Sequence, residues 1–199
     1  MSLLSSPSSS QDKPLKGEKI AILLAGGFNE RDLTESMRAL NETGAKLTII
    51  STDNGLVQGW TGSGFGHYHA VETPISSALA ADFSMLLVLS GQRSLDKLKT
   101  SPHTTRFLKG FLTYGNPLAL FGDAVQLLAH IGMADQKTVA GPVHLADTLR
   151  AAGAEWSDEP WTISDNMLTG RTDDDHLKQL VIETVAHFMN IPAELRLAA

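Results

Sequence analysis

A corner between a short strand and a helix, at residues 117–130, has the spacing of a catalytic corner. The apolar run 117–121 predicts a buried strand, residues 124–130 predict a helix, and Gly122 turns the chain between them. In many α/β enzymes such a corner holds a nucleophile in a strained backbone conformation at the carboxyl edge of the sheet. Glycine adopts these dihedral angles without steric cost, but it has no side chain to attack a substrate. The sequence therefore predicts the architecture of a catalytic corner without its nucleophile.

Two carboxylates are placed to meet near this corner. Asp32 falls in the first turn of a helix predicted from Asn29, and Asp123 directly follows Gly122. Two close carboxylates raise one pKa and suit acid–base chemistry, provided that they approach within about 6 Å. Each acid also has a structural interpretation, since Asp32 complements the positive end of its helix and Asp123 caps the unpaired N–H groups of the next one. The sequence leaves both interpretations open.

Three further patterns have a chemical and a structural interpretation. Gly26 and Gly27 follow the first strand and would cradle a phosphate, but the rest of the dinucleotide fingerprint is absent, which favours a plain tight turn. Ser63 stands between glycines as a nucleophile does, yet no strand or helix flanks it, which favours a flexible loop. His67 and His69 share a face of a predicted strand, and no third metal ligand follows at a recognisable spacing. We expect no metal and no cofactor.

Composition excludes several classes of function. The 199 residues contain no cysteine, which excludes disulfides, thiolate metal sites and thiol nucleophiles. The net charge is −6 without a basic cluster, so nucleic acid is not an expected partner. No apolar stretch approaches the roughly 20 residues that span a bilayer, and the N-terminus has no hydrophobic signal core. We therefore expect no membrane association and a cytoplasmic location.

The elements that position these residues alternate between strand and helix in one domain, at residues 18–190. A Ser/Pro-rich tail or linker at 1–17 precedes this domain, and a C-terminal tail at 191–199 follows it. Strands are expected at 19–25, 46–51, 83–89, 117–121, 137–140, 161–164 and 167–170, with a glycine-rich hairpin within 54–72. Helices are expected at 29–43, 102–114, 124–130, 146–152 and 173–189. Buried strands that alternate with helices predict an α/β fold, a three-layer α/β/α sandwich with a mostly parallel sheet and a small β-hairpin.

Five segments together resemble the DJ-1/PfpI superfamily over about residues 18–190. They are 22–28 (ILLAGGF), 89–92 (LSGQ), 122–128 (GDAVQLL), 152–159 (AGAEWSDE) and 166–171 (NMLTGR). The segment 152–159 is the most specific of the five, and the glycine-rich turns are weak evidence alone. The resemblance implies a flavodoxin-like fold of the class I glutamine amidotransferase-like type.

The resemblance also assigns positions at the corner. Superfamily members that do chemistry carry a cysteine there, commonly followed by histidine, and an acid from the first βα segment touches the thiol. In this sequence the cysteine position is Gly122, the histidine position is Asp123 and the acid position is Asp32, while Gly91 lies in the glycine-rich turn after the central strand. These four residues would form a vestigial pocket, and none of the thiol-dependent activities, which include protease, amidase, deglycase, glyoxalase and peroxide sensing, carries over.

A closer resemblance within the superfamily is to the C-terminal domain of large-subunit catalases, which lacks the cysteine and often has glycine followed by an acid, as at 120–124 (LFGDA). This resemblance implies a non-catalytic, stress-related domain that acts by binding or by stabilising an oligomer. A homodimer is the expected assembly, and a protein partner or a small ligand in the vestigial pocket is the expected contact. The two carboxylates favour a cation or an amine as that ligand. The alternative is a hydrolase-type or lyase-type enzyme that uses Asp32 and Asp123 as an acid–base pair.

Overall fold

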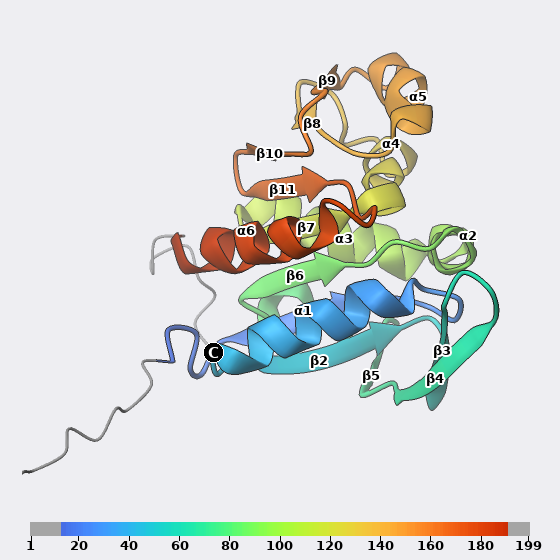
Figure 1. The fold of residues 1–199 in the computed structure, drawn as a ribbon, viewed down its shortest axis with the longest axis vertical. Coiled ribbons are helices and arrows are strands. Elements are labelled where there is room, and N and C mark those ends of the chain that lie inside the picture. Colours follow the sequence, from blue (N-terminus) through green and yellow to red (C-terminus); the bar gives the residue numbers. More distant parts are fainter. Residues whose placement is uncertain (1–12, 191–199) are drawn as a thin grey trace, which may run out of the picture.

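The computed structural model describes residues 13–190, which form three layers around a central sheet (Figure 1). Seven strands are hydrogen-bonded in the order β10-β11-β7-β6-β1-β2-β5, and all neighbours run parallel except β10 and β11. The strands of this sheet are β1 (Lys19–Leu23), β2 (Lys46–Ser51), β5 (Thr73–Pro74), β6 (Met85–Val88), β7 (Leu118–Phe121), β10 (Trp161–Ser164) and β11 (Met167–Gly170). The predicted α/β fold with a mostly parallel sheet is confirmed.

Helices cover both faces of the sheet. One face carries α1 (Glu30–Glu42) and α6 (Leu177–Asn190), and the other carries α2 (Gln92–Thr100), α3 (Pro102–Tyr114), α4 (Gln126–His130) and α5 (Ala146–Ala151). Successive side chains of a strand point to opposite faces, so Ile20 and Ile22 of β1 pack on the α1 and α6 side, while Ala21 and Leu23 pack on the other. Because both faces are buried, the strands are continuous apolar runs.

Two small sheets stand apart from the central one. The expected hairpin consists of β3 (Leu56–Trp60) and β4 (Phe65–Ala70), and it lies beyond the carboxyl end of β2 in Figure 1. A short parallel pair is formed by β8 (Thr138–Val139) and β9 (Glu155–Trp156). Trp60, Thr61 and Gly62 of this hairpin line the cleft described below.

Elements β2, α3, β10 and β11 have the bounds that the sequence predicts, whereas the last helix does not. It begins at Leu177 rather than at residue 173. In the segment before it, the Asp173 carbonyl accepts hydrogen bonds from the N–H groups of His176 (3.2 Å) and Leu177 (3.1 Å). This turn places three consecutive aspartates ahead of the helix instead of in its first turn.

The corner and the segment after β6 also differ from the prediction. A 3-10 turn over Gly122–Val125 follows β7, so the α-helix expected from residue 124 begins at Gln126. Helix α2 was not expected, although Leu95 and Leu98 have the spacing of a buried helical stripe.

The chain ends fall partly within the described residues. Of the predicted tail, residues 13–17 form a turn in which Leu15 is fully buried and donates its N–H to the Thr43 carbonyl (3.0 Å). Residues 1–12 and the predicted C-terminal tail at 191–199 lie outside the described residues. Between residues 13 and 190, none of the helices combines the length and the apolar character that crossing a membrane requires.

Candidate functional site

The corner glycine lies where three parallel strands end side by side. Strand β7 ends at Phe121, and Gly122 follows with φ +52°, a left-handed conformation that favours glycine. A Cβ atom at this position would lie 2.6 Å from Thr172 Oγ1 and 3.1 Å from Ser90 Cβ. Two side chains from neighbouring segments therefore fill the space that a side chain at position 122 would need.

Asp32 lies beneath this corner and is fully buried in the first turn of α1. The Ser90 hydroxyl donates a hydrogen bond of 2.5 Å to Asp32 Oδ2, and the other carboxyl oxygen is buried without a partner among the described residues. Burial raises the pKa of Asp32 to about 7; the hydrogen bonds from Ser90 oppose this rise, and the charge of Asp123 adds to it. The acid therefore contacts Ser90 and has no surface of its own in the cleft.

Asp123 is half-buried immediately after the corner. Its Oδ1 lies 3.3 Å from His144 Nε2, within ion-pair distance but without the alignment of a hydrogen bond. The carboxylate makes no capping hydrogen bond at the 3-10 turn, which disfavours the capping interpretation. No local pattern indicates His144 as the partner of Asp123, because this histidine lies in a 3-10 turn after β8, Val143–Leu145, whose position depends on the tertiary fold.

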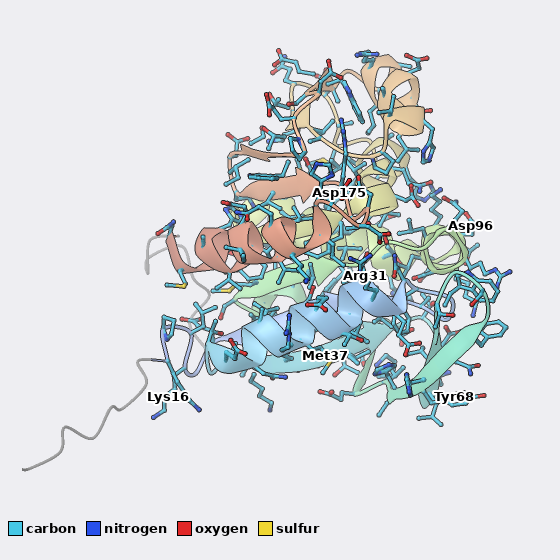
Figure 2. The ribbon with its side chains drawn as sticks, in the orientation of Figure 1. Lys16, Arg31, Met37, Tyr68, Asp96 and Asp175 are labelled. Atoms are coloured by element: carbon cyan, nitrogen blue, oxygen red, sulfur yellow. The ribbon has the colours of Figure 1, made fainter. Side chains whose placement is uncertain are left out.

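A cleft of about 880 Å³ opens at this carboxyl edge of the sheet. Gly91 lines the cleft with φ +120°, and a Cβ there would lie 2.8–2.9 Å from backbone atoms of residues 27–29, so only glycine fits. Arg31 and Asp174 form an ion pair across one side; Figure 2 labels Arg31 on α1 and Asp175 in the turn that precedes α6. The cleft is lined by Gly27, Asn29, Glu30, Arg31, Thr34, Glu35, Trp60, Thr61, Gly62, Ser90, Gly91, Gln92, Arg93, Asp123, Pro142, Arg171, Thr172, Asp173 and Asp174.

Of the four predicted pocket residues, the structure therefore places Gly91 and Asp123 in the cleft lining and Asp32 and Gly122 directly behind it. Ser90 is the connecting residue, since its hydroxyl bonds Asp32 and its Cβ faces the corner. The sequence predicts that Ser90 belongs to the turn that borders the pocket, but it does not indicate the hydrogen bond to Asp32. The signal that distinguishes it is the hydroxyl two residues after the last residue of the central strand β6.

The glycine pair after β1 is occupied by protein contacts. The Gly26 N–H donates to Asp53 Oδ2 (2.6 Å), and the Gly27 N–H donates to the Gln58 carbonyl (2.8 Å). A phosphate cradle needs free N–H groups that point at the ligand. The geometry thus favours the tight turn over nucleotide binding.

Glu30 attaches the hairpin to the first βα segment. Its carboxylate accepts a hydrogen bond of 2.8 Å from the His67 N–H and contacts the His67 ring, and it approaches so closely that a Cβ at Gly59 or Gly66 would overlap it. Burial alone would raise the pKa of Glu30, but the contacts with His67 outweigh it and hold this pKa below its ordinary value. His69 packs edge-on against Phe28, and within residues 13–190 no three His, Asp or Glu side chains are grouped as a metal ion requires.

The comparisons with known proteins agree on one family. A sequence model of the DJ-1/PfpI family matches residues 18–184. General stress protein 18 of Bacillus subtilis is 30% identical over 161 residues, which cover 80% of this chain and 91% of that protein. The putative cysteine protease YraA of the same organism is 28% identical over 158 residues, 79% of this chain and 91% of YraA. Among solved structures, a ThiJ/PfpI domain protein from Brachyspira murdochii superposes with a TM-score of 0.79 at 20% identity, over 89% of this chain and 99% of that one.

Proposed function

Because the chain belongs to the DJ-1/PfpI family, we propose that it is a member whose cleft binds a small molecule without thiol chemistry. The observation that carries this proposal is the corner. Gly122 supplies no nucleophile, Ser90 and Thr172 occupy the space around it, and the sequence of 199 residues has no cysteine elsewhere to replace it. Relatives named as a putative cysteine protease and as a deglycase therefore do not lend their activities to this chain.

The cleft itself supports a binding role. Its volume of about 880 Å³ is that of a site for a small molecule, which typically measures roughly 300–1,000 Å³. It lies outside the carboxyl ends of parallel strands, where ligands of open α/β sheets bind. Neither the volume nor the position of the cleft depends on a nucleophile, so the cleft can bind a ligand without a thiol.

The proposal also covers the cellular role, the assembly and the location of the protein. General stress protein 18, which is 30% identical to this chain, supports a stress-related role. Members of the family are commonly oligomers, which supports a homodimer that the domain helps to stabilise. We place the chain nearest to the C-terminal domain of large-subunit catalases, on the glycine followed by aspartate at residues 122–123, and we propose a cytoplasmic location.

A turnover assay tests the absence of thiol chemistry. The purified protein is assayed against methylglyoxal and a chromogenic peptide amide, beside Gly122→Cys and the double variant Gly122→Cys/Thr172→Ala, in which the crowding hydroxyl is removed. We expect the parent to be inert and the double variant to gain slow turnover, with less gain in the single variant because its Cβ meets Thr172 Oγ1. Turnover by the parent at the rate of a thiol-dependent family member would refute the proposal.

The second candidate function is acid–base catalysis by Asp32 and Asp123. The raised pKa of Asp32, about 7, favours this function, because a group that titrates near neutral pH exchanges protons most effectively there. Its full burial behind Ser90 opposes the function, since substrate would reach Asp32 only through the serine hydroxyl. Turnover that falls in both Asp32→Asn and Asp123→Asn, but not in an exposed control such as Asp147→Asn, would favour this candidate over binding alone.

A further inference from the structure

The acidic side chains in the cleft lining are all engaged by basic groups of the protein. Five carboxylates line the cleft, and each lies within ion-pair distance of an arginine or a histidine. The pairs are Glu30 with His67, Glu35 with Arg38, Asp123 with His144, Asp173 with His176, and Asp174 with Arg31. A cationic ligand would have to displace an arginine from Glu35 or Asp174, or else a histidine, which carries charge only when protonated, from one of the other three carboxylates.

Two arginines in the same lining have no such partner. The half-buried Arg171 donates from Nε to the Gly141 carbonyl (3.2 Å) and from Nη2 to the Asp158 carbonyl (2.9 Å). Within residues 13–190, no carboxylate lies within ion-pair distance of its guanidinium. A guanidinium has five N–H donors, so the two carbonyls orient the group and leave it several donors and an unneutralised charge.

Arg93 lies in the lining next to an aromatic side chain. Its guanidinium carbon is 3.9 Å from the centre of the Trp60 ring and 5.7 Å from that of Phe65. In the described part of the chain it has no ion-pair partner either. Stacking restrains the plane of an arginine without consuming its N–H donors. The hairpin side of the cleft thus combines an oriented cation with an apolar surface.

We propose that the ligand of this cleft is a small organic carboxylate, with Arg171 as the group that binds its carboxylate and Trp60 as a wall for its apolar part. This inference rests on the proposed binding function and names the ligand class. A planar guanidinium matches a carboxylate with two parallel hydrogen bonds. A dianionic phosphate fits less well, because the N–H groups of Gly26 and Gly27, which would cradle it, are occupied by protein contacts.

Direct contact, rather than long-range attraction, accounts for this recognition. The protein has a net charge of −6, and the lining holds five acids beside three arginines, so the overall field does not draw an anion toward the cleft. Binding then depends on the guanidinium, because the nearby hydroxyl protons are already used: Thr172 donates to Ser90 Oγ (3.5 Å) and Ser90 donates to Asp32. Removing the ligand's charge or the arginine should therefore abolish most of the affinity.

Calorimetry and ligand-detected NMR on the full chain test the inference. The probes are benzoate, its neutral isostere benzamide, inorganic phosphate and the amine putrescine. We expect benzoate to bind, and benzamide, phosphate and putrescine to bind at least about tenfold more weakly, a difference of ~1.4 kcal/mol. This comparison uses the unmodified protein, so no variant has to fold for it to be decisive.

Variants then locate the contact. Arg171→Gln should weaken benzoate binding at least about tenfold, and the exposed Arg93→Gln should weaken it less. The matched control is Arg150→Gln, because Arg150 is exposed on α5 and outside the lining; its Kd for benzoate should equal that of the parent.

The outcomes separate this inference from the proposed function. Preference for putrescine or phosphate over benzoate, or unchanged benzoate binding by Arg171→Gln, overturns the carboxylate assignment while the cleft remains a binding site. Binding of none of the four probes at millimolar concentration overturns the carboxylate assignment and removes the main support for a small-molecule site.

Discussion

Burial of Asp32 predicts that the folded protein loses stability as the pH rises from 3.8 toward about 7. Its pKa is raised from 3.8 to about 7, chiefly because the side chain is buried. In the unfolded chain this carboxyl ionises at its ordinary pKa, whereas in the folded state it keeps its proton until about pH 7. The folded state thus binds more protons than the unfolded state over this range. The resulting stabilisation is fully present below the unfolded pKa and is lost progressively as the pH rises to the folded pKa, above which it no longer changes.

The magnitude follows from the two pKa values. A difference of roughly three pH units corresponds to about 4 kcal/mol in all, of which about 2–3 kcal/mol is lost between pH 5 and pH 8. Asp32→Asn removes the ionisation but keeps an oxygen that accepts the Ser90 hydroxyl. The unfolding free energy of the parent minus that of Asp32→Asn should therefore fall by about 2–3 kcal/mol over this pH range, whatever constant cost the amide introduces.

Urea denaturation followed by circular dichroism at pH 5, 6, 7 and 8 measures this difference. Because both proteins share every other titrating group, the subtraction isolates Asp32. Asp147→Asn, at a fully exposed position on α5, is the control and should show a difference that does not change with pH. A flat difference for Asp32→Asn, or one that rises with pH, would show that the carboxyl is ionised in the folded protein and that our account of its burial is wrong.

Two further predictions concern glycines. Gly122→Ala should lower the unfolding free energy by about 2–3 kcal/mol, because alanine disfavours the left-handed backbone and its Cβ would clash with Thr172 Oγ1. In a Thr172→Ala background the loss should shrink to about 1–2 kcal/mol. An equal loss in both backgrounds would contradict the clash between position 122 and Thr172. Gly66→Ala should destabilise the protein by about 1.5–3 kcal/mol, because its Cβ overlaps the Glu30 carboxylate and breaks charge-assisted hydrogen bonds. Gly64→Ala, with nothing within 4 Å of its Cβ, should leave the urea midpoint nearly unchanged. Equal effects of Gly66→Ala and Gly64→Ala would contradict the close packing of Glu30 against Gly66.

The periodicity of apolar residues was sufficient to predict the fold, but it predicted the ends of the helices less well. Strand β2 and helix α3 have the predicted bounds because apolar runs, proline and a closing glycine mark them directly. The start of α6 was wrong, since the three aspartates before it bind backbone and neighbouring groups in a turn as readily as they begin a helix. Helix α2 was not predicted, although the spacing of Leu95 and Leu98 is typical of a buried helical stripe.

The candidate site divides in the same way. The absence of a nucleophile at Gly122 follows from the sequence alone, because no cysteine exists anywhere in the chain. Whether Asp32 and Asp123 meet in one site does not follow from the sequence, because it depends on the side chains packed between them. Here Ser90 lies between Asp32 and the cleft. The partners of the lining carboxylates come from loops and from the hairpin. Their pairing, and hence the free charge of Arg171, depends on tertiary packing that no local pattern encodes.

The filled corner also has an evolutionary consequence. A cysteine introduced at position 122 by itself would meet an unfavourable backbone conformation and the Thr172 hydroxyl, so it would cost stability before it provided reactivity. A change at Thr172 has to come first or together with it. Such dependence on order is epistasis between positions 122 and 172.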